Sequence, residues 1–200
     1  MVEQLFRIII VGDSSVGKTC IMLKFTEGVF KENHDATIGV ELGLRVLKLE
    51  TEDVKLQIWD TSGQENFRSV TRSFYRRSAC AILVFDFMNE ESFANCEHWL
   101  QEIKNNSKKE IVVFLVGNKR DLVEAENLEN YQKKANEFVG TNGLSGYFEV
   151  SAKSGENIEF IFKAIAEKLI ATENKQGPYD SGKFEIQLVN NQSGKAKKCC

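Results

Sequence analysis

The chain of 200 residues has a single proline, two histidines and no long apolar run. Its longest apolar stretches, 79–85 and 111–116, are about a third of the roughly 20 residues that cross a bilayer as a helix. The first seven residues include an acid and hold no separate apolar core, so they do not resemble a secretory signal. We therefore expect no transmembrane span and a chain that stays in the cytosol.

Cysteine occurs five times, but never as the C-x-x-C pair of zinc sites and redox motifs. Cys20, Cys80 and Cys96 stand alone, whereas Cys199 and Cys200 are the last two residues. This spacing suits neither a disulfide framework nor a zinc site. The terminal pair therefore needs an explanation other than packing or metal binding.

The charge balance lacks a basic excess. The net charge is −3, from 26 basic and 29 acidic residues, so general nucleic-acid binding is not expected. The hydrophobic share of 42% and the charged share of 28% are those of a globular protein. Because 200 residues are close to the upper size of one ordinary domain, we expect a single main domain.

Apolar runs with strand character alternate with helical spacing. A β-branched run at 5–11 stops at Gly12, and the residues from Gly17 on have helical spacing. Two strand-like runs, 40–50 and 54–60, are close enough to form a hairpin. Further strands are expected at 79–86, 111–117 and 147–150, and two later helix faces are formed by Phe93, Cys96, Leu100 and Ile103 and by Ile158, Ile161, Phe162, Ile165 and Leu169. The pattern predicts an α/β protein with a mostly parallel sheet, helices on both faces and ligands at the carboxyl ends of the strands.

The helical pattern stops after Ala171. Residues 174–198 are rich in Asn, Gln, Gly, Ser and Lys, and they include the only proline, Pro178. We expect a folded domain over 1–173 and a flexible tail over 174–200.

The segment from Gly12 to Thr19, GDSSVGKT, fits the phosphate-loop pattern G-x-x-x-x-G-K-[ST] between the first strand and the first helix. Glycines there allow backbone N–H groups to converge on phosphate oxygens at a positive helix terminus. Lys18 would neutralise the terminal phosphates, and the hydroxyl of Thr19 would bind Mg²⁺. The motif predicts a nucleoside triphosphate site but leaves open ATP or GTP, and a kinase or a hydrolase.

Two later loops bear on the choice of base. Asn118-Lys-Arg-Asp121 follows a buried strand, and Ser151-Ala-Lys153 follows the next one. The carboxylate of Asp121 can accept hydrogen bonds from the guanine N1–H and N2 amino groups, which adenine does not offer as a pair. Taken alone, these residues could be a solvated charge cluster. Their position at the same sheet edge favours guanine recognition.

The segment from Trp59 to Glu65, WDTSGQE, lies at the end of another strand. Asp60 can hold Mg²⁺ through a water, the N–H of Gly63 can bind the γ-phosphate, and Gln64 can orient the attacking water as the catalytic residue. Thr37, in the polar loop before the second strand, is the natural second hydroxyl ligand of the metal.

These four motifs in this order resemble those of the Ras-like small GTPases over residues 4–173, and the Rab branch is the most similar. The Rab-like segments are IGVEL at 38–42, KLQIW at 55–59, NFRSVT at 66–71, FYRRS at 74–78 and LVFDFM at 83–88. The resemblance implies the P-loop small G-protein fold, a six-stranded sheet with one antiparallel strand. It also implies two switches, around 33–42 and 62–78.

The resemblance carries roles for individual residues. Phe30 would lie against the guanine ring, the stem of Lys119 would cover it, and the N–H of Ala152 would meet the guanine carbonyl. The implied nucleotide-binding set is Ser14, Ser15, Val16, Gly17, Lys18, Thr19, Cys20, Phe30, Thr37, Gly63, Asn118, Lys119, Asp121, Ser151, Ala152 and Lys153. Leu42, Trp59 and Phe74 would form the patch that effectors read.

The implied activity is slow hydrolysis of GTP to GDP, with release of both switches when the γ-phosphate is lost, in the regulation of vesicle traffic. The implied partners are an exchange factor, a TBC-type activating protein, a GDP dissociation inhibitor, an escort protein and effectors. Two other functions stay open: a phosphotransferase of the P-loop kinase class, and a nucleotide-dependent scaffold with negligible hydrolysis.

Several positions depart from the Rab pattern. Leu42 stands where most Rab proteins have phenylalanine, Ser62 replaces the usual alanine, and Arg77 replaces the usual glycine. Ser15 occupies a phosphate-loop position that is often glycine. We expect these changes to bear on effector choice and on the hydrolysis rate.

The terminal Cys199 and Cys200 resemble a Rab double-prenylation signal. One lipid chain binds a membrane only reversibly, and a second makes the anchor stable. Near them, Lys195, Lys197 and Lys198 could add attraction to anionic lipid. The implied location is the cytoplasmic face of intracellular membranes, with cycling through the cytosol.

Overall fold

The computed structural model describes residues 4–32, 36–50, 52–63, 68–107 and 111–176. A six-stranded sheet runs through the middle of the domain in the order β2-β3-β1-β4-β5-β6. Only β2 is antiparallel to its neighbour, which confirms the predicted sheet with one antiparallel strand. The strands are β1 Gln4–Val11, β2 Val40–Lys48, β3 Asp53–Thr61, β4 Cys80–Asp86, β5 Val112–Asn118 and β6 Gly146–Glu149.

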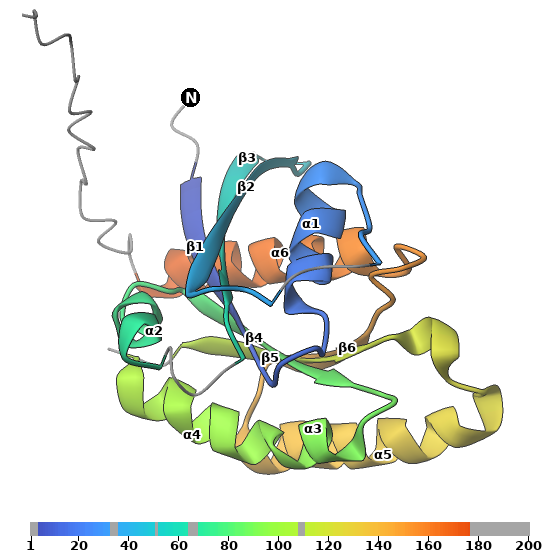
Figure 1. The fold of residues 1–200 in the computed structure, drawn as a ribbon. Coiled ribbons are helices and arrows are strands. Elements are labelled where there is room, and N and C mark those ends of the chain that lie inside the picture. Colours follow the sequence, from blue (N-terminus) through green and yellow to red (C-terminus); the bar gives the residue numbers. More distant parts are fainter. Residues whose placement is uncertain (1–3, 33–35, 51, 64–67, 108–110, 177–200) are drawn as a thin grey trace, which may run out of the picture.

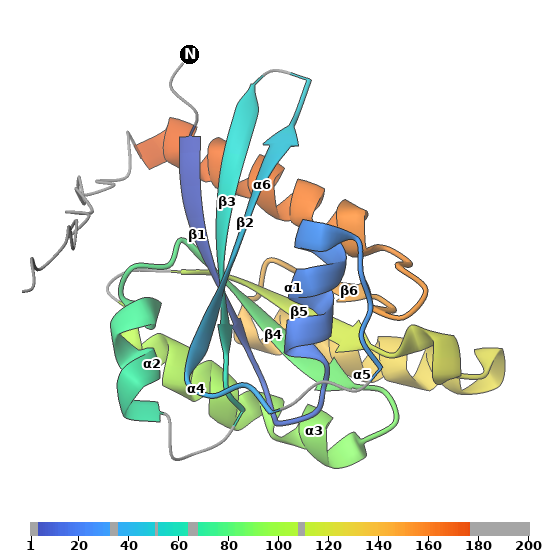
Figure 2. The same ribbon diagram turned by 45° about the horizontal axis from the view of Figure 1, so that its top comes forward.

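Helices cover both faces of the sheet (Figure 1). One face is covered by α1 and α6, and the other by α2, α3, α4 and α5 (Figure 2). Their bounds are α1 Lys18–Glu27, α2 Arg68–Tyr75, α3 Glu90–Ala94, α4 Cys96–Asn106, α5 Ala125–Asn142 and α6 Ile158–Gln176, and a 3-10 turn spans Arg120–Leu122. None of these helices combines the length and apolarity that a transmembrane span requires.

The strands bury alternate side chains on the two faces. In β1, Ile8 and Ile10 join the core under α1 and α6, whereas Ile9 and Val11 join the core under α4. All seven residues of β4 are buried, because this strand lies in the centre of the sheet with helices on both sides. Such double burial explains why the inner strands read as unbroken apolar runs.

Two helices differ from the sequence-based expectation. The apolar face from Phe93 to Ile103 indicated one helix, but Asn95 divides it into α3 and α4. At the other end of the chain, α6 continues to Gln176, beyond Ala171. The residues after Ala171 are mostly good helix formers although they extend no apolar face, so the helix outlasts the pattern.

The topology places the loops that follow β1, β3, β5 and β6 at one edge of the sheet. From β1 the chain crosses to the β2–β3 side, and from β3 it crosses to β4 on the other side of β1. In open α/β sheets a ligand binds where the crossovers diverge in this way. The four motif loops therefore meet beside the carboxyl end of β1.

Candidate functional site

The phosphate loop passes tightly between neighbouring strands. Gly12 has φ 142°, and a side chain there would collide with the carbonyl oxygen of Val84 in β4. Gly17 has φ 93°, and a side chain there would collide with the amide nitrogen of Asn118. Both positions therefore require glycine for conformation and for space. The loop delivers its backbone to the start of α1, where helix N–H groups are free to bind an anion.

Lys18, the first residue of α1, is buried, with 5% of its surface exposed. Its ammonium donates to the carbonyl oxygens of Gly12 at 2.8 Å and Asp13 at 2.6 Å. Burial lowers the pKa of Lys18 to about 8, although the nearby carboxylates of Asp60 and Asp13 act to raise it. A buried cation held by two carbonyl groups inside the phosphate loop is suited to binding phosphate oxygens.

Three oxygen ligands from three elements converge beside Lys18. The hydroxyl of Thr19 donates to Asp60 Oδ2 at 2.6 Å, and the hydroxyl of Thr37 donates to the same atom at 3.3 Å. The two hydroxyl oxygens are 2.9 Å apart. Asp60 is fully buried, and burial raises the pKa of its carboxyl to about 6.

The other carboxylate oxygen of this group, Asp60 Oδ1, is buried and makes no hydrogen bond within the described residues. A buried, unpaired carboxylate oxygen is costly, so it is an observation that calls for a partner. Two hydroxyls and a carboxylate form the hard oxygen set that Mg²⁺ prefers. The residues present therefore fit a Mg²⁺ ion bound by Thr19, Thr37 and Asp60.

Asn118, at the end of β5, links the loops of the site. Its amide donates to the carbonyl oxygen of Val16 at 2.8 Å, and its side-chain oxygen accepts from the N–H of Ala152 at 3.1 Å. The same asparagine excludes a side chain at Gly17. Asn118 thus ties the phosphate loop to the loop after β6, a structural role that its place in a binding motif did not reveal.

Two of the residues expected at the base, Lys119 and Asp121, take fixed positions. Lys119 has φ 65°, and its ammonium pairs with Asp86 at 2.7 Å. Asp121 is exposed at the cavity and accepts from the hydroxyl of the fully buried Ser151 at 2.5 Å. Since a carboxylate has about four acceptor positions, Asp121 keeps free capacity for further donors. Ser151 therefore orients Asp121 rather than lining the cavity.

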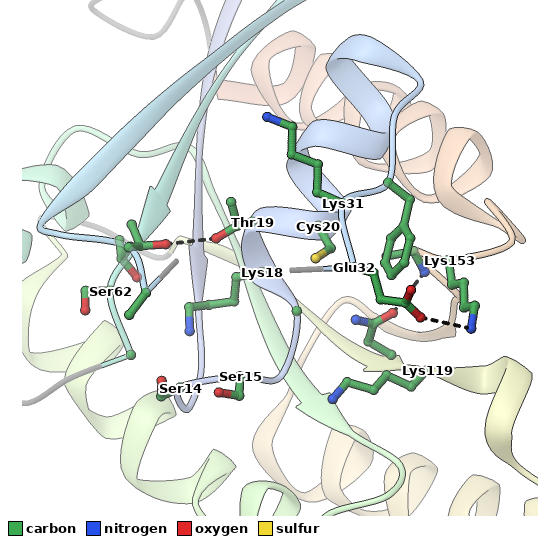
Figure 3. A pocket seen from close by; sticks show the side chains of 18 of the residues that line it. Ser14, Ser15, Lys18, Thr19, Cys20, Lys31, Glu32, Ser62, Lys119 and Lys153 are labelled. Carbon is green, nitrogen blue, oxygen red and sulfur yellow. Dashed lines mark hydrogen bonds and ion pairs between the residues drawn. The ribbon is translucent and has the colours of Figure 1, made fainter. Parts of the chain in front are cut away.

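These loops enclose a cavity of about 420 Å³ (Figure 3). Ser14 and Lys18 lie at one end of it, and Lys119 and Lys153 lie at the other. The predicted residues that line it are Ser14, Ser15, Gly17, Lys18, Thr19, Cys20, Phe30, Thr37, Gly63, Asn118, Lys119, Asp121, Ala152 and Lys153. Val16, Ser151 and Asp60 are buried and do not line it.

Six other lining residues were not among those assigned to the nucleotide: Lys31, Glu32, Ala36, Thr61, Ser62 and Leu122. Of these, Glu32 pairs with Lys153 at 3.8 Å, which joins the segment after α1 to the loop after β6. Both side chains are well exposed, so this pair contributes little stability. Thr61 and Ser62 belong to the WDTSGQE segment, whereas no sequence signal distinguishes Lys31, Glu32 and Leu122, which the path of the chain brings to the cavity.

Gly63 lies directly against the phosphate loop. A side chain at this position would collide with the backbone of Asp13 and Ser14, so only glycine allows the approach. Ser62, just before it, is buried, and its N–H donates to the carbonyl oxygen of Gly39 at 2.9 Å. The predicted catalytic residue Gln64 lies outside the described residues, as do the terminal Cys199 and Cys200.

The three residues expected to face effectors are neighbours. Leu42 in β2 is 54% exposed and lies opposite Trp59 in β3. The ring of Trp59 packs edge-on against that of Phe74, with the two ring centroids 4.7 Å apart. Trp59 itself is buried, so it offers a partner little surface of its own. The exposed apolar surface instead continues along β2 through Leu44 and Val46, which the sequence analysis did not single out.

Ser15 takes a conformation that favours glycine, with φ 66°. We expect Ser15→Gly to raise the free energy of unfolding by about 1 kcal/mol, because a left-handed conformation costs a non-glycine residue about that much or more. Denaturant unfolding without nucleotide measures the effect. Ser14→Gly is the matched control, since Ser14 does not have a positive φ, and it should lower stability. Equal shifts in the two variants would contradict the assignment of strain to Ser15.

Comparisons with known proteins show which family the chain resembles. A sequence model of the Ras family matches residues 7–171. The human, bovine and mouse proteins named Ras-related protein Rab-30 are each 44% identical over 167 residues, which is 84% of this chain and 81% of theirs. The family match covers every loop that forms the cavity, and a likeness of this extent holds across most of both chains. The chain therefore belongs to the Ras family of small GTPases and, within it, to the Rab proteins.

Proposed function

We propose that the chain binds GTP and GDP in this cavity and acts as a slow, GTP-hydrolysing switch. GTPase activity and a part in vesicle traffic are properties of the family to which it belongs. The observation that carries the proposal is the convergence of the phosphate loop and Asp121 on one cavity of about 420 Å³, a volume suited to a small ligand. The phosphate loop can bind the phosphates, and Asp121 can hydrogen-bond to the base.

The phosphate end supplies charge and backbone donors. Lys18 would exchange its carbonyl partners for phosphate oxygens, and the N–H groups at the start of α1 would complete the cradle. Thr19, Thr37 and Asp60 would hold Mg²⁺, and the ion would provide a partner for the otherwise unpaired Asp60 Oδ1. A bound Mg²⁺ neutralises charge that develops on the phosphates during transfer.

In this family the switch depends on residues of two mobile loops that contact the phosphates. The N–H of Gly63 would contact the γ-phosphate and Gln64 would orient the attacking water. Thr37 already lies beside Asp60, and Gly63 lies beside the phosphate loop, so both are placed to register the terminal phosphate. Loss of that phosphate would release the segments that carry them, and partners would read the change.

Effectors would bind the apolar surface of Leu42, Phe74 and the rest of β2, and the tail would anchor the chain. We propose a GTPase domain over 1–173 and a tail over 174–200 whose Cys199 and Cys200 carry prenyl groups. An escort protein and a GDP dissociation inhibitor would handle these groups, while an exchange factor and a TBC-type activator would drive the cycle. The chain would act at the cytoplasmic face of intracellular membranes.

Base selection provides the decisive test. The wild-type chain should bind GDP and GTP far more tightly than ADP and ATP. Asp121→Asn should weaken GDP binding about a hundredfold or more, because two hydrogen bonds to a charged group are lost. The variant should gain affinity for xanthosine diphosphate, whose 2-oxo group accepts from an amide. Fluorescence competition measures both, and Asp53→Asn, at the far end of β3, is the control. Tight ATP binding with indifference to GTP would favour the kinase reading.

Hydrolysis separates the switch from a scaffold. Single-turnover phosphate release from preloaded GTP should be slow but measurable for the wild type. It should fall to the background rate for Gln64→Leu, which removes the group that orients water. Release at the background rate from both chains would support the scaffold with negligible hydrolysis, and equal release above background would contradict the role of Gln64.

A further inference from the structure

The carboxylate of Asp13, in the phosphate loop, is held from outside the cavity. Its Oδ1 accepts from the indole N–H of Trp99 at 2.6 Å, and its Oδ2 accepts from the side-chain amide of Asn95 at 2.8 Å. None of these three residues lines the cavity. The bonds join positions 82 and 86 residues apart in sequence, so they connect two separate parts of the fold.

Both donors stand on a rigid support. Asn95 lies at the junction of α3 and α4, and the N–H of Trp99 donates to its carbonyl oxygen at 3.1 Å. Residues four apart lie on the same face of a helix, so the two side chains reach Asp13 together. Trp99 is 5% exposed, and Leu100 and Ile103 beside it are fully buried. Helix α4 is therefore fixed to the sheet and can hold the loop in place.

Asp13 also touches the other parts of the phosphate site. Its carbonyl oxygen accepts from the ammonium of Lys18 at 2.6 Å. Its negative charge acts on the same ammonium, which raises the pKa of Lys18 against the effect of burial. Gly63 lies against its backbone. A phosphate group that binds Lys18 must therefore compete with a nearby carboxylate, unless that carboxylate is held elsewhere and its charge is compensated.

We propose that Asn95 and Trp99 are positioning residues that tether the phosphate loop by the Asp13 carboxylate and keep its charge away from bound phosphates. The tether sets the affinity for nucleotide from outside the cavity. Because an uncompensated carboxylate repels the more highly charged ligand more strongly, it matters more for GTP than for GDP. This inference rests on the proposed nucleotide site and adds residues that the phosphate-loop motif does not contain.

Release of fluorescent GDP and GTP from the full chain tests the tether. Trp99→Phe keeps an aromatic ring in the core but removes the N–H, and Asn95→Ala removes the amide. Each should release GTP about tenfold faster, as loss of one hydrogen bond to a charged group predicts. Release of GDP should quicken less. Asn106→Ala is the matched control, because this amide on α4 donates to the carbonyl oxygen of Glu102 in its own helix, at 2.8 Å.

A charge-specific readout distinguishes the tether from mere packing. In the Trp99→Phe background, Asp13→Asn removes the uncompensated charge but keeps an oxygen that Asn95 can bind. The double variant should therefore recover the wild-type ratio of GTP to GDP release rates. A defect in packing alone would leave that ratio unrescued and would overturn the proposal.

The outcomes also distinguish failure of the tether from failure of the proposed function on which it rests. Wild-type release rates in both single variants, with guanine nucleotide still bound tightly, would overturn the tether and leave the proposed function intact. Failure of the wild-type chain to bind guanine nucleotide would overturn both.

Discussion

Replacing Lys18 by methionine is expected to lower the affinity for GDP and GTP about a thousandfold while the chain stays folded. The ammonium is buried inside the phosphate loop, where it donates to the carbonyl oxygens of Gly12 and Asp13. Phosphate oxygens would form charge-assisted bonds with it, each worth about 1.5–3 kcal/mol, and two such bonds give the stated loss. Methionine has a similar length and an apolar stem, so it fills the same space.

The measurement is titration of fluorescent GDP into the nucleotide-free chain. Lys24→Met is the matched control: Lys24 lies on the same helix but outside the cavity, and its ammonium donates to Gly28 at 3.4 Å on the surface. The control should bind as the wild type does. If Lys18→Met bound GDP with wild-type affinity and a wild-type unfolding midpoint, the cavity would not be a phosphate site.

The pH dependence of the same titration gives a second readout. Because burial sets the pKa of Lys18 near 8 in the free chain, part of the population is neutral above that pH. Bound phosphate raises this pKa, so binding takes up a proton there, and affinity falls as the pH rises from 7 to 9. Deprotonation of guanine affects the wild type and Lys18→Met alike. A fall of equal size in both chains would therefore contradict the role of the ammonium.

The parts of this site that sequence could predict are those where chemistry demands one residue type at one spacing. Gly12, Gly17 and Lys18 belong to a contiguous motif whose backbone geometry leaves no alternative. Asp60 and Thr37 are distant in sequence from Thr19, yet the WDTSGQE motif and the loop before the second strand were enough to assign all three to one metal site. The alternation of strands and helices was enough to predict the fold, because the apolar repeats of strands and of helices are local properties of the chain.

The parts that sequence could not predict depend on side chains that meet from separate elements. Asn95 and Trp99 read as members of an amphipathic helix, and nothing local indicates that both bind Asp13. Likewise, Ser151 was expected at the nucleotide but is buried behind Asp121. Such contacts depend on the packing of α4 and of the loop after β6, which no local period encodes. These contacts position the residues of the site, whereas the sequence motifs identify the residues that line the cavity.

Asp60→Asn is expected to stabilise the nucleotide-free chain near neutral pH and to remove the effect of Mg²⁺ on nucleotide release. The carboxyl is fully buried, and burial raises its pKa from 3.8 to about 6. The folded state therefore binds a proton more tightly than the unfolded state does. The protonated Asp60 carboxyl makes its full contribution to stability below about pH 4, and this contribution is lost as the pH rises to about 6. At pH 7 the wild type therefore carries the whole free-energy cost of burying the charge.

Asparagine has a similar shape and an oxygen that can still accept from Thr19 and Thr37, but it carries no charge. Since one pH unit between two pKa values corresponds to about 1.4 kcal/mol, the variant should gain on the order of 3 kcal/mol in the free energy of unfolding at pH 7. The gain should vanish near pH 4. Denaturant unfolding from pH 4 to 8, without nucleotide or Mg²⁺, measures it. Asp53→Asn, exposed at the start of β3, is the control and should show no such pH-dependent gain.

Asp60→Asn should also weaken Mg²⁺ binding, because the negative charge whose burial is costly is the charge that would hold the ion. Chelation of Mg²⁺ should accelerate GDP release from the wild type about a hundredfold, since an ion held by Thr19, Thr37 and Asp60 would add to the binding of the nucleotide. Release from Asp60→Asn should be fast with or without Mg²⁺. A variant that gained no stability at pH 7 would show that burial of this charge is not costly. A variant that kept its response to Mg²⁺ would show that Asp60 does not hold the ion, and the charge at the end of β3 would then need another explanation.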